Sequence, residues 1–95
     1  MAFESIAAAQ DCREYLGIKG NTYVTVNGYV DGNPHNVTIL SDYDKVIFSF
    51  ESAICGYQYF DSRFQKMEWD EEECTLTISS DKQNYSFEVH FPEQY

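Results

Sequence analysis

The hydrophobic pattern of the chain changes its period once, after Leu16. Between residues 3 and 16 apolar side chains recur at helical spacing, Ala7–Ala9 favour helix, and no Gly or Pro interrupts the segment. Gly17 and Gly20 mark the end of this predicted helix. From residue 22 onward apolar and polar positions alternate, which predicts strands with one buried and one exposed face.

Turn-forming residues divide the alternating part of the chain into strands. Asp31–Pro34 predicts a hairpin turn, and Gly56 suggests a bend within residues 52–62, where the pattern is least readable. The predicted strands cover residues 22–30, 36–40, 45–51, 63–69, 74–80 and 85–91. One helix and about six mainly antiparallel strands indicate an α+β fold, with the helix on the buried face of the sheet. We expect residues 1–95 to form a single domain.

The charge balance narrows the possible partners. Sixteen Asp and Glu residues oppose six Lys and Arg residues, which gives a net charge of −10. Direct binding to nucleic acid needs clustered basic side chains, and anionic membrane surfaces repel such a chain. The same charge favours fast association with a basic protein, although it can also serve solubility alone.

The residues that usually carry catalysis or bind metals are scattered. Cys12, Cys55 and Cys74 are widely spaced, and His35 and His90 belong to no recognisable motif. We therefore expect no enzyme activity, no metal and no cofactor. Free thiols, an N-terminus without a basic region and no long apolar stretch favour a cytoplasmic location.

Three surfaces are candidates for binding a partner. The first is the acidic segment Glu68–Glu73, in which Trp69 can act as an anchor or be part of the core. The second is the row of Tyr23, Thr25, Asn27 and Tyr29, which can form an interface or pack under a second layer. The third is the aromatic run of Tyr57, Tyr59, Phe60 and Phe64, part of which belongs to the core while the rest can border an interface. The predicted partner-binding residues are Glu68, Trp69, Asp70, Glu71, Glu72, Glu73, Tyr23, Tyr29, Asp42, Asp44 and Asp61.

The spread of acidic residues, which includes the Asp70–Glu73 run, Asp42, Asp44, Asp61 and Glu88, suggests a class of protein. In length, acidity and lack of catalytic motifs the chain resembles small phage or mobile-element proteins that inhibit CRISPR or restriction systems. The resemblance covers the whole chain as composition and includes no family motif. It implies an inhibitor that blocks a basic nucleic-acid-binding host defence protein by occlusion or by mimicking nucleic acid.

The main alternative is an immunity protein that neutralises a basic toxin or nuclease, because acidic and aromatic residues suit both roles. A module for small molecules would need a discrete apolar pocket, for which a one-sided sheet under one short helix leaves little room. The sequence leaves open whether the chain is a monomer or a homodimer.

Overall fold

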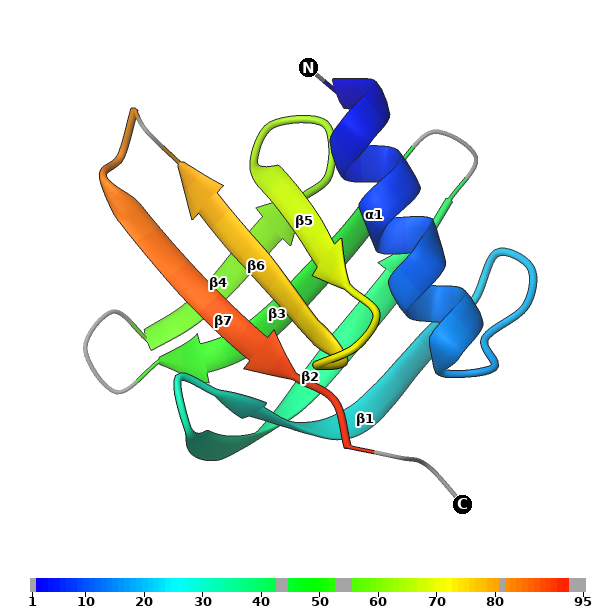
Figure 1. Ribbon diagram of the computed structural model, residues 1–95, viewed down its shortest axis with the longest axis horizontal. Coiled ribbons are helices and arrows are strands. Elements are labelled where there is room, and N and C mark those ends of the chain that lie inside the picture. The colour runs from blue at the N-terminus through cyan, green and yellow to red at the C-terminus, as the bar shows by residue number, and fades with distance from the viewer. Residues whose placement is uncertain (1, 43–44, 53–55, 81, 93–95) are drawn as a thin grey trace.

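A computed structural model describes residues 2–42, 45–52, 56–80 and 82–92 as one helix and seven strands. These elements are α1 (Ala2–Tyr15), β1 (Tyr23–Val30), β2 (Asn33–Ser41), β3 (Val46–Ser52), β4 (Gly56–Asp61), β5 (Lys66–Asp70), β6 (Thr75–Ser80) and β7 (Tyr85–His90). All paired strands are antiparallel, in the order β4-β3-β2-β1-β7-β6-β5. Figure 1 shows a curled sheet, a half-barrel, with α1 beside β5. The predicted α+β architecture is confirmed.

The sheet has seven strands, and the expected number of about six was too low by one. The additional strand, β4, lies in the segment whose pattern was least readable. Two adjacent residues of β4 explain why the pattern did not reveal this strand, because Tyr59 is 70% exposed and Phe60 is buried. An aromatic residue on each face hides the alternation that identifies a half-buried strand. The strand expected at residues 63–69 begins only at Lys66, because Phe64 and Gln65 donate their backbone N–H groups to the carbonyl of Asp61 in a turn.

The first hairpin turn is shorter than the sequence predicts. Asp31 and Gly32 both have positive φ, 49° and 86°, as a two-residue hairpin loop requires. Pro34 therefore lies inside β2, opposite Tyr29, instead of in the turn. A proline is tolerated at this position because β3 pairs only with residues 38–41 of β2.

The end of α1 is fixed by backbone hydrogen bonds and by a buried arginine. Gly17 has a φ of 75° and donates to the carbonyl of Glu14, while Ile18 donates to the carbonyl of Arg13 at 3.0 Å. This pattern is a Schellman motif, for which glycine is preferred. The buried Arg13 side chain donates to Gln10 and to the carbonyl of Gly20, which ties the following loop to the helix.

An aromatic cluster fills the inside of the curled sheet. Phe50 stacks on Phe60 at 5.2 Å between ring centroids and meets Phe87 edge-on at 5.6 Å, while Phe60 also meets Tyr85. β3 and β4 thus contact β7, although β2 and β1 separate them in the sheet. The curl of the sheet brings these faces together, and the aromatic contacts stabilise it.

Helix α1 covers the open edge of the sheet at β5. The hydroxyl of Ser5, a buried side chain of α1, accepts a hydrogen bond of 3.0 Å from the backbone N–H of Met67. An edge strand with unpaired N–H groups is prone to pair with other chains, and this contact satisfies one such group. α1 is thereby held against β5.

No helix in the described ranges is both long and apolar enough to cross a bilayer.

Candidate partner-binding site

The candidate site is built around a contact between α1 and β5. Trp69 packs against Tyr15 with 5.5 Å between ring centroids and an interplanar angle of 46°. β5 alternates, so that Met67 and Trp69 face the helix while Glu68 and Asp70 are exposed. Trp69 is half-buried against the core, and Tyr15 remains 37% exposed. Part of the Trp69 ring thus packs against the core and part stays accessible, and its role as an anchor for a partner stays a prediction.

Acidic residues from two distant segments surround this aromatic pair. Asp11 and Glu14 of α1 and Glu71 of the β5–β6 turn line a groove with Tyr15 and Trp69, with a volume of about 360 Å³. The three acids are exposed. Glu14 also lies in the last turn of α1, where the helix dipole adds negative potential. The groove therefore favours a positively charged group.

Sequence reasoning missed Asp11 and Glu14. Their spacing of three places them as neighbours on one helix face, next to Tyr15. That local signal was present in the sequence, but only the packing of α1 on β5 shows that this face meets the acidic hairpin.

The acidic residues of the hairpin surround a second, adjoining groove. This groove is lined by Glu68, Trp69, Asp70, Glu71, Glu72 and Thr77. Asp70 has a structural role there, because its Oδ1 accepts the backbone N–H groups of Glu72 and Glu73 at 3.0 and 3.2 Å. Glu68 forms an ion pair with Lys66 at 3.1 Å, in which both side chains are largely exposed. The side chains of Glu71, Glu72 and Glu73 are exposed on a turn that Asp70 fixes.

The far side of the acidic turn is tied to β7. The carbonyl of Glu73 lies 2.9 Å from His90 Nδ1 and accepts the Thr75 hydroxyl at 3.0 Å. Cys74, with a φ of 52°, makes the backbone change direction between these contacts. The carboxylates of Glu71, Glu72 and Glu73 therefore lie on a turn that is fixed at both ends. A fixed turn loses less conformational entropy when a partner binds.

Tyr23 and Tyr29 lie apart from this groove. Both are on β1, on the face of the sheet that points away from the core, and they are 69% and 43% exposed. Among the described residues no second layer covers Tyr23, and the part of both tyrosines in partner binding stays a prediction. Asp42 is exposed just after β2, and Asp44 lies outside the described residues.

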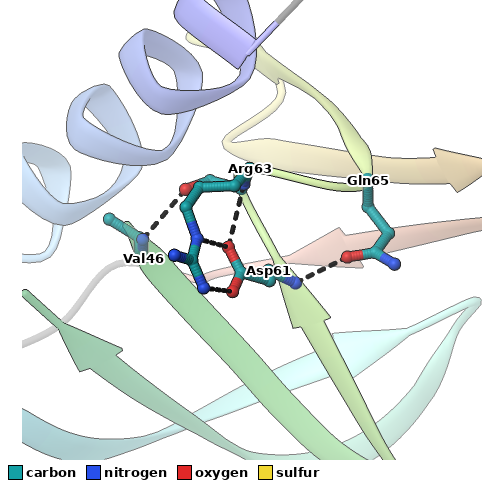
Figure 2. A network of polar contacts seen from close by, with 5 residues as sticks. Val46, Asp61, Arg63 and Gln65 are labelled. Carbon is teal, nitrogen blue, oxygen red and sulfur yellow. Dashed lines mark hydrogen bonds and ion pairs between the residues drawn. The ribbon is translucent and has the colours of Figure 1, made fainter. Parts of the chain in front are cut away.

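Asp61 is engaged within the chain (Figure 2). Its carboxylate accepts from Arg63 Nη2 at 2.9 Å and Nε at 3.2 Å, and its Oδ1 also accepts the Arg63 backbone N–H. Its own N–H donates to Gln65 Oε1 at 2.7 Å. Burial alone would raise the pKa of Asp61, but the hydrogen bonds and charge of Arg63, with the charge of Lys45, lower it overall. These contacts give Asp61 a structural role, and its part in partner binding stays a prediction.

The two described cysteines lie in different surroundings. Cys12 is buried in the core, and burial raises the pKa of its thiol, which is therefore protonated at neutral pH. Cys74 lies at the acidic turn, with its Sγ 3.7 Å from the carbonyl of Glu71, and Cys55 lies outside the described residues. Within the part of the chain that the structure describes, no group of three or more His, Cys, Asp and Glu residues is placed to hold a metal.

Comparison with protein-family models, with curated proteins and with solved structures finds no match to this chain.

Proposed function

We propose that this chain is a small acidic inhibitor, encoded by a phage or mobile element, that binds a basic nucleic-acid-binding protein of a host CRISPR or restriction system. It acts in the host cytoplasm by occupying the surface that the nucleic acid would use, without turnover. The observation that supports this proposal best is the convergence of Asp11, Glu14 and Glu71 on the accessible Tyr15–Trp69 pair.

The charge distribution supplies the first part of the argument. A nucleic-acid duplex carries about one negative charge per 1.7 Å of helix axis, and a protein that binds it presents Lys and Arg side chains to these phosphates. The exposed carboxylates of α1 and of the β5–β6 turn offer several negative groups on one side of this molecule. The net charge of −10 accelerates the encounter with such a basic surface.

The aromatic pair supplies the second part. Charges at the rim of an interface contribute mainly to the rate of association, whereas buried aromatic anchors carry much of the affinity. An arginine of the partner can stack on the indole of Trp69 while its guanidinium contacts Glu14 or Glu71. The Tyr15 ring keeps the indole in place for this contact.

The same site suits an immunity protein that neutralises a basic toxin or nuclease, because the partner surface has the same chemistry in both cases. The two functions differ in the identity of the bound protein. A component of a defence complex would indicate the first, and a toxin the second.

The proposal is tested by retention of proteins from host-cell lysate on the tagged chain, with low-salt and high-salt washes. The test variant is Glu14→Lys/Glu71→Lys, which reverses two charges in the groove. The matched control is Glu51→Lys/Glu88→Lys, which reverses two exposed charges on β3 and β7. We expect the wild type and the control to retain one basic nucleic-acid-binding protein at low salt and less of it at high salt, and the groove variant to lose it. Equal loss with both variants would contradict a role for the groove, and retention of no protein would contradict the proposal.

A further inference from the structure

We propose that the outward face of strands β1–β4 is a contact surface for a second copy of this chain. We call this surface the tyrosine face and define it by Tyr23, Tyr29, Leu40 and Tyr59, each of which is exposed by 39% to 70%. This inference does not depend on the proposed inhibitor function.

The pairing of the strands places these side chains on one surface. Tyr23 lies opposite Leu40, and Leu40 lies opposite Ile47 on β3. A second row of side chains crosses all four strands and begins on β1 at Thr25, two residues after Tyr23. This row consists of Thr25, Thr38, Ser49 and Tyr59. Thr38 and Ser49 are only 7% and 4% exposed, so Thr25 and Tyr59 form the accessible part of this row.

Among the described residues of β1 and β2, the outward positions of this face carry no acidic or basic side chain. On β3 and β4, Ile47, Ser49 and Tyr59 continue this uncharged area. Charge begins at the margin, with Glu51 on β3 and with Asp61, which Arg63 neutralises. In a chain with sixteen acidic residues, this uncharged area contrasts with the groove at Trp69.

The absence of charge on this face selects its occupant. A basic protein would gain no ion pair there, and nucleic acid would find no Lys or Arg for its phosphates. Two copies of this chain, each with a net charge of −10, repel one another wherever their acidic surfaces meet. Contact through the tyrosine face keeps the carboxylates apart. A two-fold axis through this face pairs each copy's tyrosines with the same surface of the other copy.

The size of the face indicates a weak dimer. With roughly 200 Å² for each aromatic side chain, the exposed parts of the three tyrosines amount to about 350 Å², to which Leu40 and the exposed polar side chains of the face add. A standard stable interface buries about 800 Å² on each partner. We therefore expect a dimer that forms at high protein concentration and exchanges rapidly with monomer.

The test is sedimentation equilibrium of the full chain over a range of concentrations, at low and high salt. Screening weakens the repulsion between like-charged copies, so the dimer should strengthen as salt rises. Binding of a basic protein through the acidic groove should weaken under the same change, so the two contacts respond to salt with opposite sign. We expect the average mass to rise above the 11.0 kDa of one chain with concentration, and more so at high salt.

Two variants that each add one negative charge assign the contact. Tyr23→Glu places a carboxylate in the tyrosine face, and Gln83→Glu places one in the exposed β6–β7 turn. We expect Tyr23→Glu to weaken dimerisation by about tenfold or more and Gln83→Glu to leave it unchanged. Matching circular dichroism spectra would show that both variants fold. A wild type that stays monomeric at every concentration and salt, or a dimer that Tyr23→Glu leaves intact, would overturn the proposal. If Tyr23→Glu instead weakened binding of a basic protein while the wild type stayed monomeric, the face would belong to that partner.

Discussion

Tyr15, at the end of α1, and Trp69, on β5, pack ring against ring at 5.5 Å and so join the N-terminal helix to the acidic hairpin. Without this contact Asp11 and Glu14 would belong to one surface and Glu71 to another. With it, the acids flank one accessible aromatic pair. The proposed function depends on this arrangement.

The contact can be followed through the fluorescence of Trp69, the single tryptophan of the chain. We expect Tyr15→Ala to shift the emission of Trp69 to longer wavelength, because the half-buried indole gains contact with water. Loss of the aromatic pair should lower the free energy of unfolding by about 1 kcal/mol. Tyr29→Ala is the control, since Tyr29 is on the outward face of β1 and should leave the emission unchanged. An unaltered spectrum in Tyr15→Ala would contradict the packing.

The acidic turn should tolerate charge reversal of its exposed glutamates. The Asp70 carboxylate, rather than Glu71, Glu72 or Glu73, accepts the hydrogen bonds that shape the turn. We expect Glu71→Lys/Glu72→Lys/Glu73→Lys to keep the wild-type melting temperature or to raise it, because like-charge repulsion is relieved. Asp70→Ala should lower the free energy of unfolding by about 1 kcal/mol through loss of these contacts. A collapse of the triple variant in thermal melts would show that the glutamates are structural.

Ser5→Ala should destabilise the contact between α1 and the sheet edge. The variant leaves the backbone N–H of Met67 without its acceptor, at a cost of about 1–2 kcal/mol in the free energy of unfolding. Ser86→Ala changes an exposed serine on β7 and serves as the control in urea titrations. The amide of Met67 should also exchange its hydrogen faster in Ser5→Ala. Equal stability of the two variants would contradict the role of Ser5.

Asp61→Asn should reduce stability at neutral pH and have less effect in acid. The Arg63 contacts keep the pKa of Asp61 lower in the folded chain than in the unfolded one. Their stabilisation is therefore complete above the unfolded pKa, about 4, and is lost as the pH falls through the folded value. For a pair at the surface we expect a loss of roughly 0.5–1 kcal/mol at neutral pH. Urea titrations across this pH range should converge for wild type and variant in acid, and a difference that grew in acid would refute the assignment.

Tyr23→Ala should cost little stability. Its side chain is 69% exposed, so we expect a change within about 0.5 kcal/mol in the free energy of unfolding. Tyr29→Ala should lower the free energy of unfolding by more, because the Tyr29 and His90 rings lie against each other where β1 meets β7, with 6.3 Å between ring centroids. A large loss of stability in thermal melts of Tyr23→Ala would place this tyrosine in the core after all.

The sequence predicted the regular strands well, because their alternation reflects burial directly. Val24 and Val26 of β1, and Leu76 and Ile78 of β6, face the core as their spacing indicates. β4 escaped because Tyr59 and Phe60 place aromatic rings on both faces. Pro34 was assigned to the turn because its tolerance within β2 depends on where β3 stops pairing, which is not a local property of the sequence.

The candidate site was predictable only in part, for a similar reason. The run of acids around Trp69 is visible in one segment, and the structure presents it at the end of β5 and on the exposed turn that follows. The contribution of Asp11 and Glu14 depends on how α1 packs against β5, which local pattern does not determine. Asp61 showed the opposite problem, because an acidic residue that looked available for a partner binds Arg63 two positions away.

Competition with nucleic acid tests the central claim most directly. The measurement is the fluorescence anisotropy of a labelled duplex bound to the basic protein that the wild-type chain retains, titrated with the wild type, the groove variant Glu14→Lys/Glu71→Lys and the control Glu51→Lys/Glu88→Lys. If the groove occupies the nucleic-acid surface, the wild type and the control will release the duplex and lower the anisotropy, while the groove variant will not. A rise in anisotropy on addition of the wild type would mean that the chain binds beside the duplex in a ternary complex, and would contradict occlusion.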